Sequence, residues 1–254
     1  MIASLPMYDW PEVRAATDQL WDGIARHLGT AIALTRGENY AALWTRNDLL
    51  FSQTCGYPFT HALAGKVTLV ATPHYAVDGC DGPNYSSIIF AREQAPLAAF
   101  RGAVAAVNGA HSMSGMLALK LVFQPLARDG RFFGRAIESG GHIRSLTAVR
   151  DGKADVCAID AICVAMARAY RPDYLDGLVE IGRSPPVPGL PFITLAGNPE
   201  AIRAALASAL ADPDLQAARD QLFWSGFSAL KSQDYQRIVS LEAAMEHNGG
   251  LELI

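Results

Sequence analysis

The feature that most constrains the fold is the alternation of short apolar runs with amphipathic segments along nearly the whole chain. Apolar runs at 49–53, 85–91, 103–108 and 155–159 have the length and composition of buried strands, and the stretches between them have helical spacing. Strands that alternate with helices form parallel-rich sheets with helices on both faces. The sequence therefore predicts an α/β fold.

Two segments rich in proline and glycine interrupt this alternation, at 73–84 and at 182–191. They are read as crossovers between two lobes, the first made of 1–77 plus 182–254 and the second of 78–181, inserted into it. Ligands of open α/β sheets bind beyond the carboxyl ends of the strands. Each lobe is therefore predicted to turn that edge of its sheet toward one common cleft.

Composition and charge exclude several classes of protein. The net charge is −4 and lysines and arginines form no run, so a nucleic-acid surface is not expected. No apolar stretch reaches the ~20 residues of a membrane-spanning helix, and the first residues do not have the pattern of a secretion signal. The mature form of a secreted protein and an intracellular protein both fit. The four cysteines form no C-x-x-C pair, so no metal site is expected, and a Cys55–Cys80 disulfide stays open.

The segment Asn108-Gly-Ala-His-Ser-Met-Ser-Gly115 follows a predicted strand and begins a predicted helix. The first turn of a helix has unpaired N–H groups and the positive end of the helix dipole. Small residues let an anion approach these donors, and the hydroxyls of Ser112 and Ser114 add further donors. The segment predicts an oxyanion site, although a serine that only caps the helix would give the same pattern.

Two further residues follow predicted strands. His142 comes after Ser139-Gly-Gly141, where glycines allow close backbone approach, and an imidazole there can donate to an oxyanion and gain charge near neutral pH. Asp160 ends the strand 155–159 and could accept a proton from a ligand oxygen or an amine. A plain capping role is the alternative for both. Tyr8, Tyr57 and Tyr85 lie near strand ends, where a tyrosine suits a wet binding site.

Four segments together resemble one known family: FRGAVAAVNGAHSMSG, SGGHIRSLTAVRDGKADVCAID, YSSIIF and SPPVPGLPFI. They resemble the phosphate-, phosphite- and phosphonate-binding proteins of ABC importers, which have the two-lobed type-II periplasmic-binding-protein fold. The resemblance covers roughly residues 1–200. It implies a small anionic ligand, an ABC permease as partner, a periplasmic location, no cofactor and no catalysis.

The resemblance also implies roles for individual residues. Ser112, the Met113 N–H and Ser114 would hold the anion head. Tyr85, His142 and Asp160 would complete the second-lobe side, and Tyr8 and Tyr57 the first-lobe side. Two features depart from the family pattern: no secretion signal is visible, and Asn108 stands where the family commonly has aspartate. The ligand stays open, since sulfonates, carboxylates and phosphorylated or heterocyclic nutrients also fit.

Two rival functions are a small serine hydrolase and a stand-alone cytoplasmic sensor of the same fold. The hydrolase lacks support, because no G-x-S-x-G elbow, P-loop or H-E-x-x-H motif is present. The order Ser114, His142, Asp160 also differs from the Ser…Asp…His order of the α/β-hydrolases. The sequence favours a binding protein over an enzyme, but it does not separate a carrier from a sensor.

Overall fold

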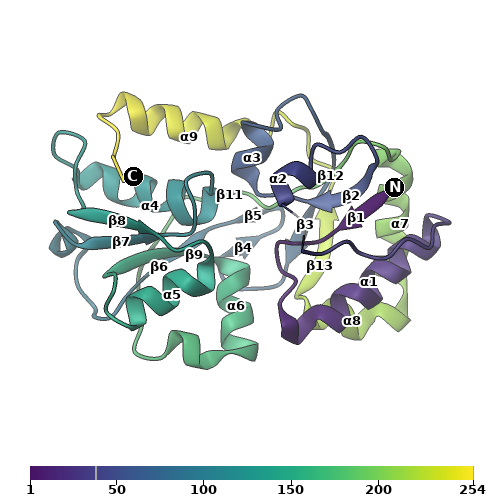
Figure 1. Ribbon diagram of the computed structural model, residues 1–254, viewed down its shortest axis with the longest axis horizontal. Coiled ribbons are helices and arrows are strands. Elements are labelled where there is room, and N and C mark those ends of the chain that lie inside the picture. The colour runs from purple at the N-terminus through teal and green to yellow at the C-terminus, as the bar shows by residue number, and fades with distance from the viewer. Residues whose placement is uncertain (38, 254) are drawn as a thin grey trace. The chain divides into compact units, whose positions relative to one another are not determined.

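The computed structural model describes residues 1–37 and 39–253 and contains two compact units, each with its own five-stranded sheet (Figure 1). Unit 1 comprises 1–76, 81–83 and 188–235, and unit 2 comprises 77–80, 84–187 and 236–254. Within the described residues, every helix is too short or too polar to cross a membrane.

The sheet of unit 1 has the strand order β1-β2-β12-β3-β13. β1 and β2 are parallel, β12 is antiparallel to both β2 and β3, and β13 is antiparallel to β3. β1, β2 and β3 therefore end at the same edge of the sheet. The strands are β1 (Ile2–Ser4), β2 (Leu49–Gln53), β3 (Thr68–Tyr75), β12 (Phe192–Thr194) and β13 (Trp224–Ser228).

Helix α1 organises the helical layer of unit 1, because it packs against both α7 and α8 while α7 contacts β3. Asn198 caps α7 by accepting from the Glu200 and Ala201 N–H groups, as the Asn-Pro pair predicts. The helices are α1 (Arg14–His27), α2 (Tyr40–Leu43), α3 (Gly56–Thr60), α7 (Pro199–Ala211) and α8 (Gln216–Gln221), with short 3-10 turns at Pro11–Val13 and Pro213–Leu215.

The sheet of unit 2 has the order β10-β6-β9-β7-β8. β7, β8 and β9 are parallel, whereas β6 is antiparallel to β9 and to β10. The strands are β6 (Ser87–Ala91), β7 (Val104–Val107), β8 (Arg135–Glu138), β9 (Val156–Asp160) and β10 (Val179–Arg183). A small third sheet, β11-β5-β4, is formed by the connecting segments Val187–Pro188, Asn84–Tyr85 and Cys80–Asp81.

Helices cover both faces of the unit 2 sheet, α5 and α6 on one face and α4 and α9 on the other (Figure 1). A one-turn π-helix leads into α4. The elements are the π-helix (Met113–Leu117), α4 (Ala118–Phe123), α5 (His142–Arg150), α6 (Ala161–Tyr170) and α9 (Gln236–His247), with 3-10 turns at Leu97–Phe100, Gln124–Leu126 and Pro172–Leu175.

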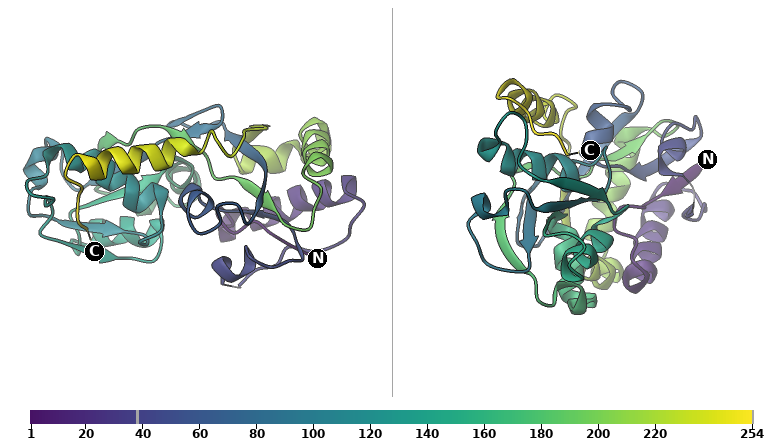
Figure 2. Two further views of the ribbon diagram at one scale, coloured as in Figure 1. Left: turned by 90° about the horizontal axis from the view of Figure 1, so that it is seen from above. Right: turned by 60° about the vertical axis from the view of Figure 1, so that its left-hand side comes forward.

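The predicted α/β class with parallel pairs flanked by helices is confirmed, with both sheets mixed rather than mainly parallel. The division of the chain differs from the predicted one at its C-terminal end. The first lobe was expected to include all of 182–254, but 182–187 and the described residues from 236 onward belong to unit 2, where α9 is drawn in yellow (Figure 2). The reason is the contact of α9 with α4, supported by the ion pair between Lys120 and Glu246 at 3.8 Å and by the burial of Leu251.

Three local predictions need correction. The stretch between the predicted strands at 85–91 and 103–108, which was expected to be helical, forms only a 3-10 turn at Leu97–Phe100, because Pro96 restricts the residue before it to extended backbone. The strands β10 and β13 are not expected from the sequence, since VEIGR and WSGFS lack the apolar runs by which the other strands are found.

Candidate functional site

The carboxyl edge of the unit 2 sheet brings together most of the predicted site residues. The register pairs Val107 of β7 with Glu138 of β8, so the segments that begin at Asn108 and Ser139 leave the sheet side by side. On the other side of β7, the parallel strand β9 ends at Asp160, which pairs with Ser87 at the start of β6. This edge is where an open α/β sheet binds its ligands.

The helix after β7 begins with a widened turn. The Leu117 N–H donates to the Ser112 carbonyl at 3.0 Å, the spacing of a π-helix, and the Ser112 Oγ accepts from the Gly115 N–H at 3.0 Å. Ser112 is therefore the N-cap that the sequence left as an alternative. The capping bond uses a lone pair of Oγ, so the Ser112 proton is still able to donate to a ligand.

Asn108 packs beneath this turn. A Cβ at residue 115 would lie 1.9 Å from the Asn108 Oδ1, so only glycine fits there. The Asn108 Oδ1 is buried and has no hydrogen-bond partner among the described residues. Gly115 is thus needed for the close approach of the strand end to the helix start.

The start of α5 supplies the second half of the site. The Ser114 Oγ and the His142 Nε2 lie 2.8 Å apart, and the Asn108 Nδ2 lies 3.5 Å from the same nitrogen. Ser139 fixes the glycine turn before His142, because its Oγ is 3.1 Å from the Val107 carbonyl and 2.7 Å from the Ser145 Oγ. Two helix starts therefore meet at one hydrogen bond.

The charge state of His142 differs from the one predicted. Burial lowers the pKa of His142 to about 4, an effect that the Ala158 carbonyl partly opposes by favouring a proton on the ring. Nδ1 is buried and makes no hydrogen bond of ordinary geometry among the described residues. The imidazole is therefore neutral at pH 6 to 8, and the expected gain of charge near neutral pH is wrong.

The remaining unit 2 residues are buried around this edge. Asp160 is 1% exposed and caps α6, its Oδ1 accepting from the Ile162 and Cys163 N–H groups at 2.8 and 3.3 Å. Tyr85 is 2% exposed and lies two residues before β6. The Met113 side chain is part of the core, so only its backbone N–H can face a ligand.

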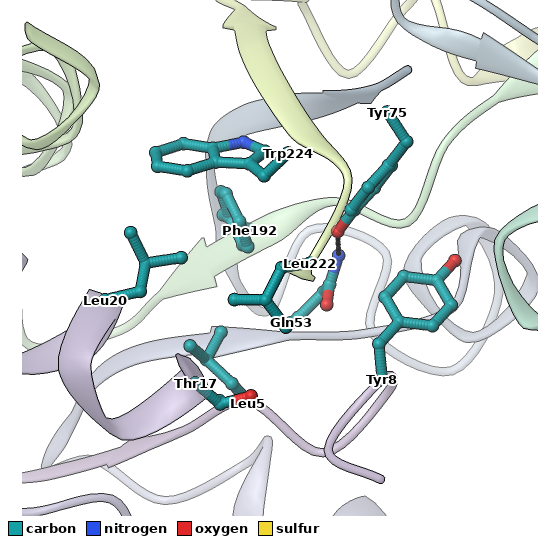
Figure 3. Close-up of a pocket in the computed structure, with 9 residues that line it drawn as sticks. All are labelled: Leu5, Tyr8, Thr17, Leu20, Gln53, Tyr75, Phe192, Leu222 and Trp224. Atoms are coloured by element: carbon teal, nitrogen blue, oxygen red, sulfur yellow. Dashed lines mark hydrogen bonds between the residues drawn. The ribbon is translucent and has the colours of Figure 1, made fainter. Parts of the chain in front are cut away.

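The carboxyl edge of the unit 1 sheet has a different character. It holds a cavity of about 40 Å³ lined mainly by aromatic and aliphatic side chains and by no charged group (Figure 3). Gln53 donates from Nε2 to the Tyr75 hydroxyl at 3.2 Å, and the Trp224 Nε1 is buried without a hydrogen-bond partner among the described residues. The lining residues are Leu5, Tyr8, Thr17, Leu20, Gln53, Tyr75, Phe192, Leu222 and Trp224.

The two tyrosines predicted for the first-lobe side of the site, Tyr8 and Tyr57, lie in different surroundings. Tyr8 lines the cavity and meets Tyr75 edge to face, with ring centroids 5.3 Å apart. Tyr57 stacks on His61 at 3.9 Å in and after α3. Their predicted contacts with a ligand stay predictions.

Sequence reasoning missed three residues that shape these edges. Asn108 was treated as a departure from a family pattern. It directly follows a buried strand, however, and a polar residue at the end of a buried strand is the same signal by which Asp160 was chosen. Ser139 precedes two glycines, the composition of a tight turn, but nothing in the sequence shows which backbone it ties down. Trp224 belongs to the unpredicted strand β13, so no signal pointed to it.

The comparisons with known proteins concern the family and the fold of the chain. The family model described as "ABC transporter, phosphonate, periplasmic substrate-binding protein" matches residues 2–235. No curated protein matches the sequence. The described part of the chain has no group of three or more His, Cys, Asp or Glu side chains placed to hold a metal ion.

Solved structures of low sequence identity share the fold. PhnD1 of Prochlorococcus marinus, in complex with methylphosphonate, is 13% identical, with a TM-score of 0.78 over 96% of this chain and 98% of that one. A binding-protein component of a phosphonate ABC transporter from Pseudomonas aeruginosa is 18% identical, with a TM-score of 0.77 over 97% and 87%. XAC2383 of Xanthomonas citri, bound to ATP, is 16% identical, with a TM-score of 0.69 over 97% of each chain. The match over residues 2–235 shows that this chain belongs to the periplasmic substrate-binding proteins of phosphonate ABC transporters.

Proposed function

We propose that the protein binds a small phosphonate- or phosphate-like anion at the carboxyl edge of the unit 2 sheet and delivers it to an ABC permease from the periplasm. The observation that carries the proposal is the meeting of two helix starts at the bond between Ser114 and His142. Unpaired N–H groups and positive dipole ends at both helices favour an anion there.

The donors of this edge are numerous enough for useful affinity without a lysine or arginine. The Ser112 hydroxyl and the Met113 and Ser114 N–H groups lie in the first turn after β7. A hydrogen bond to a charged group contributes about 1.5–3 kcal/mol, and a partly buried helix terminus contributes up to ~2 kcal/mol. Three such bonds reach the order of −8 kcal/mol that corresponds to micromolar binding, before the cost of ordering the ligand is subtracted.

A serine hydrolase is the rival function, because the Ser114 Oγ lies 2.8 Å from the His142 Nε2. Two features argue against it. A catalytic histidine is oriented by a third group, usually a carboxylate at Nδ1, whereas Ala158 offers His142 only a backbone carbonyl. The pKa of about 4 also makes the imidazole a weak general base at neutral pH. Binding without catalysis is therefore the proposed activity.

Calorimetry with phosphate, methylphosphonate, sulfate and acetate tests the proposal. The double variant Ser112→Ala/Ser114→Ala should bind at least ten-fold more weakly, a loss of ~1.4 kcal/mol or more, because two hydroxyls at the helix start are removed. Ser208→Ala, an exposed serine on α7, is the matched control and should bind like the parent. An unchanged affinity in the double variant would remove this edge as the anion site.

A further inference from the structure

Two Asn-Gly pairs occur in the chain, Asn108-Gly109 at the end of β7 and Asn248-Gly249 directly after α9. In such a pair the backbone nitrogen of the glycine can attack the side-chain amide carbon of the asparagine, because glycine has no side chain to hinder the approach. Asparagine is for this reason one of the thermally labile residues of proteins. The fold decides which pair reacts, since the attacking nitrogen and the amide must both be able to move.

The Asn108-Gly109 pair is held by few hydrogen bonds. It lies in a turn outside helix and strand, and the next two residues, Ala110 and His111, are exposed, so water reaches the turn. The Gly109 N–H makes no hydrogen bond among the described residues. The Asn108 Oδ1 has no partner in the part of the chain that the structure describes, and its Nδ2 lies 3.5 Å from the His142 Nε2, at the outer limit of a hydrogen bond. The attacking nitrogen and the amide are therefore both uncommitted.

The Asn248-Gly249 pair is an internal comparison with the same chemistry. The Gly249 N–H donates to the Glu246 carbonyl at 3.2 Å, and the Asn248 N–H donates to the Ala244 carbonyl at 3.1 Å. The Asn248 carbonyl in turn accepts from the Gln124 Nε2 at 2.6 Å. Attack would require this nitrogen to give up its acceptor and the backbone on both sides to turn. The pair should therefore react more slowly in the folded protein, even though Asn248 is exposed and Asn108 is half-buried.

We propose that Asn108 is a site of self-modification, at which the folded protein forms aspartate and isoaspartate through a cyclic imide. The Gly109 nitrogen bonds to the Asn108 Cγ and loses its proton to a solvent base, while the side-chain nitrogen of Asn108 takes up a proton and leaves as ammonia. Water then opens the imide. Opening at Cγ gives aspartate, and opening at the backbone carbonyl carbon gives isoaspartate, so the whole reaction consumes water and releases ammonia.

Both products disturb the packing beneath the start of the helix after β7. Aspartate places a negative charge where the Asn108 Oδ1 is buried without a donor among the described residues, which is costly. Isoaspartate adds a methylene carbon to the backbone where the strand end approaches Gly115 so closely that a Cβ there would lie 1.9 Å from the Asn108 Oδ1. The isoaspartate form should therefore bind an anion at this helix start at least ten-fold more weakly. Only this consequence rests on the proposed function.

Peptide mass mapping of the native protein, aged at pH 8 and 37 °C in H₂¹⁸O, tests the modification. We expect aspartate and isoaspartate that carry a heavy oxygen to accumulate at Asn108 at least ten-fold faster than at Asn248. In urea, where neither pair is held by the fold, the two rates should converge. Equal rates in the folded protein, or a faster reaction at Asn248, would overturn the inference.

The variant Gly109→Ala separates the imide route from direct hydrolysis of the amide. A Cβ at residue 109 would meet only the Glu138 Oε1, at 3.9 Å, so the fold has room for it. Because a methyl group hinders the attacking nitrogen, modification of Asn108 should slow at least ten-fold while Asn248 keeps its rate. Gly182→Ala, which also adds a methyl in ordinary contact within unit 2, is the control and should age like the parent. An unchanged rate at Asn108 in Gly109→Ala would show that no cyclic imide forms.

Calorimetry with methylphosphonate measures the consequence for binding. Relative to its own fresh sample, the aged parent should contain a weak-binding fraction equal to its isoaspartate fraction, whereas aged Gly109→Ala should bind as before. An equal loss in both proteins would show that the damage lies elsewhere and would contradict this consequence. If the fresh parent does not bind methylphosphonate, the proposed function fails, and the mass map still decides whether Asn108 is modified.

Discussion

The carboxyl edges of the two sheets differ in strand pairing and in chemistry: an antiparallel strand separates β2 from β3 in unit 1, whereas β8, β7 and β9 are adjacent and parallel in unit 2. In unit 1 the edge is a cavity of about 40 Å³ with aromatic and aliphatic walls, and in unit 2 it is a pair of helix starts joined by a serine and a histidine. In unit 1 the strands β1, β2 and β3 end among large side chains, whereas in unit 2 the strands β7 and β8 lead into glycines and serines. The difference shows that strand topology sets where a site can form, and that the residues just after the strands set what it binds.

The largest expected effect is on the stability of unit 1. Leu20 is 7% exposed and lines the cavity, so Leu20→Ala should lower the free energy of unfolding by about 2–5 kcal/mol as the cavity grows. Chemical denaturation measures the loss, with the exposed Asp22→Ala on the same helix as control. Anion affinity at unit 2 should stay within two-fold, and a ten-fold loss would break the separation of the two edges.

The next largest effect concerns the close approach of the Gly115 backbone to the Asn108 side chain in unit 2. The new methyl of Gly115→Ala would meet the Asn108 Oδ1, so the variant should lose about 1–3 kcal/mol of stability and at least ten-fold in anion affinity. Gly141→Ala, whose methyl has open space around it, should change stability by less than about 1 kcal/mol. Adding Asn108→Ala to Gly115→Ala should restore part of the stability, and no recovery would show that the clash is not the cause.

Acid sensitivity should also differ between the units. The pKa of His142 is depressed to about 4, against about 6.5 in an unfolded chain. As the pH falls, the unfolded state is therefore protonated before the folded state is. Stability is fully present above pH 6.5 and is lost as the pH falls toward 4, by at most about 1.4 kcal/mol per unit.

The variant His142→Gln should flatten this slope more than His74→Gln does. Burial lowers the pKa of His74 as well, but by less than it lowers the pKa of His142, which falls to about 4. Urea titrations from pH 4 to 7 would show the difference. An equal slope in the parent and in His142→Gln would mean that the imidazole is not buried neutral.

The smallest effect compares one hydroxyl from each edge. The Thr17 Oγ1 donates to the carbonyl of Val13, the residue before α1, and Thr17 lines the unit 1 cavity. Thr17→Val keeps the shape, so we expect a change in stability within about 1 kcal/mol and no change in anion affinity. Ser114→Ala should lower phosphonate affinity without a comparable loss of stability. If calorimetry shows that Thr17→Val lowers phosphonate affinity and Ser114→Ala does not, the chemical roles assigned to the two edges are wrong.

The sequence predicted the α/β class and most strand positions because apolar runs and helix caps are local signals. It failed where the cause is tertiary. The C-terminal helix α9 belongs to unit 2 through its contact with α4, and the polar strand β13 forms only because β3 offers it a partner. Neither contact leaves a periodic pattern in the chain.

The candidate site was predicted in the same uneven way. Ser112, Ser114 and His142 were found because small residues after a strand and before a helix are a local pattern. The low pKa of His142 could not be foreseen, since it comes from burial among side chains far apart in the sequence. The packing of Asn108 against Gly115 likewise requires two segments to be placed in space.

The central claim is that the anion sits at the start of the helix after β7. The most direct measurement is an NMR titration with methylphosphonate that follows backbone amides and Trp indole resonances in one sample. The account predicts saturable shifts of the Met113 and Ser114 amide resonances and of the His142 ring, with the double serine variant losing them. Saturable shifts confined to Trp224 and its neighbours at the unit 1 cavity, with Met113 and Ser114 unmoved, would contradict it.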